Sequence, residues 1–305
     1  MSTVNSTLAR RQRLKTSLNG LSLGDAFGQQ FFYRQSWATA RASRTIPPAP
    51  WKYTDDTEMA LGIAEVLLEH GAVEQDVLAR VFARRYSENP HRGYGSGAHD
   101  VLTAISRGVE WRTAAGQLFD GQGSMGNGAA MRVAPLGGWF ADDLDQAASQ
   151  ARLSAEVTHL HPDGIAGAIA VAVAAALAWQ TSQSGASFSR SEFFAEVLAR
   201  TPAGETRNGI ETAASLPEGM WSHDAAGRLG DGSRILSSDT VPFCLWVAAG
   251  NMSDFTEGLW ATVHVGGDID TNCAIVGGIL ALAVGEEGLP SNWLKMREEV
   301  TLNGL

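Results

Sequence analysis

The chain has little cysteine and no strongly apolar stretch long enough to cross a bilayer. Only Cys244 and Cys273 occur among its 305 residues, which excludes a disulfide framework and fits a reducing, cytoplasmic location. The first 15 residues are polar and basic, without the apolar core of a secretory signal. The longest apolar run, residues 164–179, consists mainly of Ala, Val and Gly and is shorter than a membrane span. We therefore expect a buried helix there.

Basic residues are also in the minority. The 23 Lys and Arg residues face 33 Asp and Glu residues, which gives a net charge of −10. An acidic protein lacks the broad positive surface that neutralises a phosphate backbone, so we expect no nucleic-acid partner. A local basic pocket for one small phosphate ligand stays possible.

Alternating strand patterns are scarce, whereas helical signals dominate. One mainly helical domain over residues 1–305 is therefore expected, with residues 1–13 as a loose N-terminal extension and residues 229–240 as a loop. Helices are predicted over residues 56–70, 73–86, 100–109, 143–157, 162–180, 191–200, 243–249, 254–263, 271–284 and 290–300.

Two acidic clusters lie far apart in the chain. Residues 54–57 read Thr-Asp-Asp-Thr, and residues 266–271 read Gly-Gly-Asp-Ile-Asp-Thr. Each precedes an apolar helix, so its aspartates could simply be helix caps. Two such clusters favour another interpretation, in which the carboxylates meet and cations offset their repulsion. Oxygen ligands without cysteine or clustered histidine suit Mg²⁺, Mn²⁺ or Ca²⁺ rather than Zn²⁺, and two divalent ions would be a natural solution.

A Gly-rich segment at residues 121–132 contains the pattern GxGxxG. The preceding residues 113–119 predict a helix rather than a strand, so a dinucleotide-binding βαβ unit is not expected. A Gly-rich loop that runs into a helix can still hold phosphate with backbone N–H groups. The small residues at 93–97 would also let a ligand approach the backbone, although a plain loop explains them equally well.

Two histidines precede Pro162, at positions 159 and 161. Histidines at this spacing could bind a metal, or they could form a hydrogen-bonded turn at a helix start. Of the two, His159 is the better candidate for a site and His161 for a structural role.

These motifs together resemble the ADP-ribosylglycohydrolase family. The resemblance rests on Gly-Asp-x-x-Gly at residues 24–28, on residues 54–57, 126–132 and 267–272, and on Thr-His at residues 158–159, in family order. It extends over about residues 14–293, nearly the whole chain. It implies an all-α, compact single-domain orthogonal helical bundle whose central dinuclear cleft holds two Mg²⁺ or Mn²⁺ ions.

The resemblance also implies roles for individual residues. The expected catalytic residues are Asp56, the first candidate for general base, Asp270, the second, and His159, which would orient the target side chain. The implied metal ligands are Thr54, Asp55, Asp56, Asp268, Asp270 and Thr271. The implied contacts to diphosphate and ribose are Gly123, Ser124, Met125, Gly126, Asn127 and His159.

One position departs from the family pattern. Many members carry a glutamate eight residues after the first glycine of Gly-Asp-x-x-Gly, and here that position is Phe32. Residues 29–31 supply no carboxylate in its place. The departure favours arginine-linked or small-molecule substrates over serine-linked ones.

From the resemblance we expect a metal-dependent hydrolase that cleaves the glycosidic bond of ADP-ribosyl-arginine on protein and releases ADP-ribose. Two alternatives stay open: a hydrolase of a small ADP-ribose derivative such as an O-acyl ester, and a non-catalytic ADP-ribose-binding module. The expected partner is an ADP-ribosylated protein or small ADP-ribose conjugate. We further expect a cytoplasmic monomer without a membrane partner.

Overall fold

Helices account for nearly all of the regular structure. The computed structural model describes residues 3–32, 37–185 and 187–301, and within these ranges it has no β-strand. The helices are α1 (Thr3–Gln29), α2 (Trp37–Ser43), α3 (Asp55–His70), α4 (Gln75–Glu88), α5 (Ser96–Ser106), α6 (Trp111–Gly116), α7 (Leu118–Gly121), η1 (Asn127–Ala129), α8 (Ala134–Trp139), α9 (Leu144–Glu156), α10 (Pro162–Ser184), α11 (Arg190–Arg200), α12 (Glu205–Ser215), α13 (Ser222–Leu229), α14 (Ser237–Gly250), α15 (Phe255–Val265), α16 (Ile269–Val284), η2 (Glu286–Gly288) and α17 (Ser291–Leu294).

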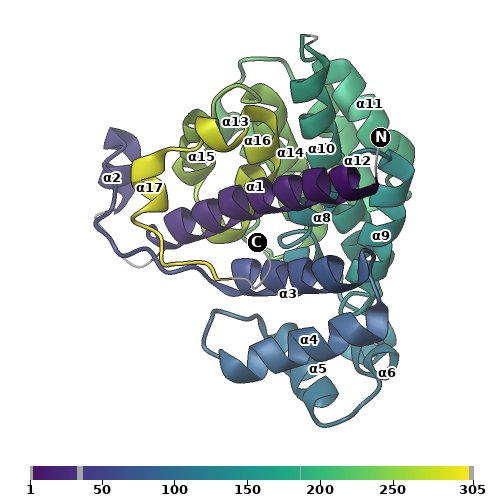
Figure 1. Cartoon of the computed structure of the whole chain (residues 1–305). Coiled ribbons are helices and arrows are strands. Elements are labelled where there is room, and N and C mark those ends of the chain that lie inside the picture. The colour runs from purple at the N-terminus through teal and green to yellow at the C-terminus, as the bar shows by residue number, and fades with distance from the viewer. Residues whose placement is uncertain (1–2, 33–36, 186, 302–305) are drawn as a thin grey trace.

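The buried apolar side chains form one continuous core, which confirms the expected compact all-α fold (Figure 1). At its centre lies α10, the one helix in the described ranges that is long and apolar enough to cross a membrane. Most of its surface is buried inside the protein, since 78% of its most apolar window is covered. The expected buried helix is therefore confirmed, and its small Ala and Gly side chains let neighbouring helices pack closely around it.

Several helix ends follow the sequence signals. Gly71 ends α3 in the left-handed conformation with φ of 76°, where the absence of Cβ removes the steric cost. Asp143 and Asp254 cap α9 and α15 through hydrogen bonds from backbone N–H groups in the first turn. Pro162 occupies the first position of α10, where a missing N–H group costs nothing.

Glycines let α1 and α16 touch backbone to backbone. Gly20, Gly24 and Gly28 are four residues apart and therefore share one face of α1. A methyl group at Gly24 would stand 2.0 Å from the carbonyl oxygen of Cys273, and one at Gly28 would stand 2.8 Å from Cα of Asp270. No side chain fits in this contact, which we call the glycine seam. It holds the end of α1 against the start of α16.

Residues 3–13 do not form a loose extension, contrary to expectation. Helix α1 already begins at Thr3 and continues without a break. Near its middle, the buried Arg13 donates two hydrogen bonds of 2.8 and 2.6 Å to the carboxylate of Asp142. This two-pronged ion pair ties α1 to the loop before α9.

Three other predicted boundaries were wrong. Helix α17 ends at Leu294 instead of continuing to residue 300, because the following backbone pairs with Trp51. The Trp51 N–H group donates to the Met296 carbonyl (2.7 Å), and the Glu298 N–H group donates to the Trp51 carbonyl (2.8 Å). Extended pairing thus replaces the helix.

The predicted loop at residues 229–240 ends early because α14 starts at Ser237 and includes Pro242. Proline cannot donate an intrahelical hydrogen bond. Its ring packs instead against α12, where a methyl group on Gly209 would lie 2.5 Å from Pro242 Cγ. Helix α5 likewise starts at Ser96, four residues before the predicted start, so part of the Gly-rich segment 93–97 is helical.

We predict that Gly24→Ala destabilises the protein by about 1–3 kcal/mol or more, because the new methyl group must push α1 away from α16. The matched control is Gly227→Ala in α13, where a methyl group meets nothing within 4 Å. That change should be neutral or stabilising by up to about 1 kcal/mol. Urea unfolding of both variants measures the difference, and equal stability would show that the glycine seam is not tight.

Candidate functional site

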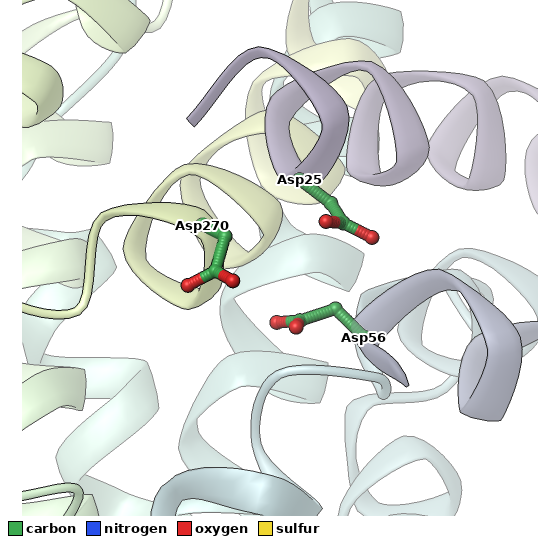
Figure 2. Close-up of side chains that lie close together, drawn as sticks. All are labelled: Asp25, Asp56 and Asp270. Atoms are coloured by element: carbon green, nitrogen blue, oxygen red, sulfur yellow. The ribbon is translucent and has the colours of Figure 1, made fainter. Parts of the chain in front are cut away.

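Three aspartates from three helices meet at one point. Asp25 comes from α1, Asp56 from the start of α3 and Asp270 from the start of α16, and Figure 2 shows their carboxyl groups pointing into the same space. One oxygen of each lies within 4.8 Å of the others. The glycine seam brings Asp25 close to Asp270, because Gly24 and Gly28 flank Asp25 on α1. This arrangement can bind a metal ion.

Asp25 also organises the start of α3. Its carboxylate accepts hydrogen bonds from the backbone N–H groups of Thr54 (3.0 Å) and Thr57 (3.1 Å). The hydroxyl groups of Thr54 (2.8 Å) and Thr57 (2.5 Å) lie within hydrogen-bond distance as well. Thr54, the residue at the N-cap position, makes no capping bond itself. The cap therefore comes from another helix, and Asp55 and Asp56 are left free of the capping role.

Asp56 has an oxygen without a partner. Its Oδ2 lies 2.8 Å from the Thr54 hydroxyl, but its Oδ1 is buried and makes no hydrogen bond with the described residues. The Thr54 hydroxyl also lies 2.8 Å from Asp25 Oδ1, so its single proton cannot serve both carboxylates. Orphaned carboxylate oxygens in a set of hard oxygen donors are what a divalent cation would satisfy. The residues present therefore fit a metal ion.

Burial and mutual repulsion make these carboxyl groups hard to ionise. Burial raises the pKa of Asp25 to about 6, and burial together with the charge of Asp25 raises the pKa of Asp55 to about 8. The pKa values of Asp56 and Asp270 are raised well above the usual range for the same reasons, burial first and neighbouring aspartates second. A cation in the cluster would favour the charged forms.

The Gly-rich loop is tied to the second acidic cluster. Asn127 Nδ2 donates to Asp268 Oδ2 (2.7 Å) and lies 3.0 Å from the Thr240 hydroxyl. Residues 125–127 also pair with residues 235–237, since the N–H group of Asn127 donates to the Ile235 carbonyl at 3.2 Å. The loop before α14 thus holds the Gly-rich loop beside the start of α16.

A cavity of about 560 Å³ opens over the acidic clusters and the Gly-rich loop. Most of the predicted site residues line it: Asp55, Asp56, Ser124, Met125, Gly126, Asn127, His159, Asp268, Asp270 and Thr271. Thr54 lies behind, where its hydroxyl contacts the two carboxylates described above. Gly123 is also behind the wall, since a methyl group there would lie 2.8 Å from the backbone nitrogen of His161. The structure therefore brings the two acidic clusters and the loop together, but Thr54 and Gly123 do not line the cavity.

The two histidines occupy different environments. His161 is the N-cap residue of α10, and its Nδ1 accepts a hydrogen bond from the Asp163 N–H group (3.1 Å). His159 lines the cavity instead, with its Nδ1 atom 2.7 Å from the Thr158 hydroxyl. Burial and the charge of Arg132 lower the pKa of His159 to about 3, so its ring is neutral near pH 7.

Sequence reasoning missed several residues at the site. Asp25 stands in the Gly-Asp-x-x-Gly motif, but its partner helix could not be known from the sequence. Arg132, a fully buried residue at the end of the quoted 126–132 motif, also lines the cavity. Phe119 and Ile235 line it with left-handed backbones, φ of 51° and 58°, and nothing in the sequence marks them.

Phe32, the residue at the expected glutamate position, is 40% exposed and does not line the cavity. No carboxylate from residues 29–32 therefore joins the cluster. Residues 33–36 lie outside the described ranges.

Comparison with known proteins gives consistent matches over nearly the whole chain. Residues 6–304 match the family model described as ADP-ribosylglycohydrolase. The ADP-ribosylhydrolase ARH3 of Bos taurus is 28% identical, covering 92% of this chain and 87% of its own. The ARH3 of Mus musculus is 30% identical over 92% and 86%. A solved structure of an ADP-ribosylglycohydrolase-related protein complex is similar in fold, with a TM-score of 0.68 and 23% identity over 95% of this chain and 94% of that chain.

The raised pKa values predict that metal-free protein loses stability as pH rises. Asp25 and Asp55 titrate near pH 3.9 in the unfolded chain but at about 6 and about 8 in the folded one. The folded state thus binds more protons between these values, and the free energy of unfolding falls from about pH 4 through pH 8. We expect a loss on the order of 5 kcal/mol between pH 5 and pH 8 in EDTA, at roughly 1.36 kcal/mol per pKa unit, most of it from Asp55.

Saturating Mg²⁺ or Mn²⁺ should reverse this trend, because cation binding needs deprotonated ligands and strengthens with pH. Urea unfolding at both pH values, with EDTA and with the metal, provides the measurement. A metal-free protein that is as stable at pH 8 as at pH 5 would contradict the electrostatic description of the cluster.

Proposed function

Because the chain belongs to the ADP-ribosylglycohydrolase family and is a glycohydrolase, we propose that it hydrolyses the bond between ADP-ribose and arginine on modified proteins. The observation that carries the proposal is the cluster of Asp25, Asp56 and Asp270 at the base of a cavity walled by the Gly-rich loop. Such a cavity combines a site for cations with a neighbouring surface for a polar ligand.

Two Mg²⁺ or Mn²⁺ ions are the proposed cofactors. When bound, they would make a coordinated water acidic enough to supply a hydroxide near neutral pH. The residues that would hold them are the six expected from the sequence, namely Thr54, Asp55, Asp56, Asp268, Asp270 and Thr271. Asp25, the third aspartate of the cluster, also fixes the start of α3, because its carboxylate accepts hydrogen bonds from Thr54 and Thr57.

The Gly-rich loop is the proposed site of the diphosphate and ribose. Two of its N–H groups are already engaged, because Gly126 donates to Ser124 Oγ (3.1 Å) and Asn127 donates to the Ile235 carbonyl. Ser124 Oγ therefore accepts a hydrogen bond and keeps its own proton to donate to a ligand oxygen. The hydroxyl of Ser124 is thus proposed to take over part of the role expected for the backbone of the loop.

Asp56 is the proposed general base and Asp270 the second candidate. The buried, unpartnered Oδ1 of Asp56 can accept a proton, and the Thr54 hydroxyl lies 2.8 Å from the other oxygen of that carboxylate. Attack at the ribose C1 atom would pass through an oxocarbenium-like state, whose positive charge the surrounding carboxylates stabilise.

Because the ring of His159 is neutral, the site favours a leaving group that does not need a proton from this residue. With a pKa of about 3, His159 cannot act as an imidazolium acid near pH 7. A guanidine is itself basic and leaves readily once it is protonated, which supports an arginine linkage over an alkoxide leaving group. The absence of a carboxylate at Phe32 points in the same direction. His159 is therefore proposed to orient the ligand rather than to transfer a proton.

We predict metal-dependent release of free ADP-ribose from arginine-modified protein. Purified enzyme is incubated with arginine-linked, serine-linked and O-acyl ADP-ribose substrates, each with Mg²⁺ and with EDTA, and the released ADP-ribose is quantified. Release from the arginine-linked substrate that stops in EDTA is the expected result. Preferential cleavage of the ester would support the small-molecule alternative, and binding of ADP-ribose without any release would support the binding-module alternative.

Asp56→Asn should lower kcat for the arginine-linked substrate by at least about 100-fold, since it removes the base and a metal ligand but keeps the shape. The matched control is Asp224→Asn on the exposed surface of α13, which should keep full activity. Full activity of the metal-loaded Asp56→Asn enzyme would rule out the assigned base.

A further inference from the structure

Arg132 is a buried cation that makes no direct contact with a carboxylate among the described residues, although the charge of Asp55 acts on it from a distance. Its side chain is fully buried in the cavity wall and forms no ion pair with the described residues. The guanidinium lies 4.5 Å from the centre of the Phe82 ring, and its Nη2 donates to the Ser154 carbonyl (3.1 Å) and to the Thr158 hydroxyl (2.9 Å). Burying such a charge without a direct anion contact is costly, so these few contacts define where it can sit.

The contact between Arg132 and Thr158 sets the direction of the next hydrogen bond. A guanidinium can only donate, so the Thr158 oxygen must accept from it. The proton of the Thr158 hydroxyl is then free to be donated, and the acceptor within reach is Nδ1 of His159 at 2.7 Å.

The opposite assignment would leave a buried donor unsatisfied. If Nδ1 of His159 carried a proton, it and Arg132 would both donate to the Thr158 oxygen. The hydroxyl proton would then have no acceptor among the described residues, although Thr158 is 97% buried. A buried donor that is left unpaired is destabilising. The proton of the neutral ring therefore belongs on Nε2.

The Nε2 atom opens on the cavity. It makes no hydrogen bond in the described ranges, and part of its surface is accessible to solvent. A methyl group at Gly128 would lie 3.2 Å from it and one at Gly126 would lie 3.5 Å from it, so the glycines of the loop leave room for a ligand atom there.

We propose that Arg132 acts through Thr158 to hold His159 in its Nε2–H tautomer, so that His159 presents one fixed hydrogen-bond donor to a ligand oxygen in the cavity. Arg132 and Thr158 are positioning residues in this relay. That the ligand is the diphosphate or ribose of ADP-ribose rests on the proposed function, whereas the tautomer does not. Burial lowers the pKa of Arg132 only to about 9, so it stays charged near pH 7.

The tautomer can be read directly by long-range ¹H–¹⁵N NMR on protein with ¹⁵N-labelled histidine. The chain has seven histidines, and the signals that disappear in the His159→Gln variant belong to His159. The expected result is a protonated Nε2 and an unprotonated Nδ1, with no change between pH 5 and pH 8. A protonated Nδ1 in the wild-type protein overturns the proposal.

Thr158→Val and Thr158→Ser form the matched pair of variants. Valine removes the relay, so the His159 signals should shift to a mixture of tautomers, and serine should restore the wild-type pattern. Unchanged signals in a folded Thr158→Val protein would also overturn the proposal. If that variant does not fold, the wild-type and serine spectra still decide the assignment.

Calorimetric titration of the metal-loaded proteins with ADP-ribose tests the use of the donor. We expect Thr158→Val to weaken binding by about fivefold to tenfold, the effect of one hydrogen bond, and Thr158→Ser to bind within about twofold of wild type. Equal affinity of both variants would show that the donor does not reach the ligand. Failure of the wild-type protein to bind ADP-ribose would contradict the proposed function and remove this ligand from the proposal, while the NMR result decides the relay.

Discussion

The direct backbone contact between α1 and α16 is the constraint on which the rest of the site depends. Gly24 and Gly28 remove the side chains that would separate the two helices, and Asp25 lies between them on α1. The contact therefore places Asp25 beside Asp270. Asp25 in turn caps α3 and so fixes Asp56 in the same place. A single close approach between two helices thus positions groups on three of them.

This arrangement concentrates negative charge where water is scarce, and the protein compensates only part of it. Asp25 receives hydrogen bonds from the first turn of α3, whereas Asp56 Oδ1 receives none. The one buried cation lining the cavity, Arg132, makes no ion pair with the cluster in the described chain and contacts Thr158 instead. The unmet demand of the carboxylates is thus left to a cation from solution, and the same buried setting keeps His159 neutral. Burial therefore accounts both for the demand for a cation and for the uncharged state of the His159 donor.

Much of the fold could be predicted from the sequence because the signals were local. The caps at Asp143 and Asp254, the Gly71 stop and the apolar run of α10 each act within a few residues. The acidic clusters could also be recognised as a candidate cation site, because helix capping alone is a weaker explanation when carboxylates occur next to threonines twice in one chain. The all-α fold was confirmed for these reasons.

What could not be predicted depends on partners distant in sequence. Asp25 caps a helix that begins 30 residues later, and Trp51 pairs with residues 296–298, which prevents the predicted last helix. Pro242 is tolerated within α14 next to Gly209 of another helix. The left-handed backbones of Phe119 and Ile235 likewise have no signal in a short window. In each case a tertiary contact outweighs the local preference.

The central claim is that the converging aspartates form a metal site, and anomalous X-ray scattering from crystals grown with Mn²⁺ tests it most directly. The account predicts anomalous density between the starts of α3 and α16, within coordination distance of Asp56 and Asp270. Crystals of active, Mn²⁺-loaded enzyme with no density there, or with density only elsewhere, would contradict it.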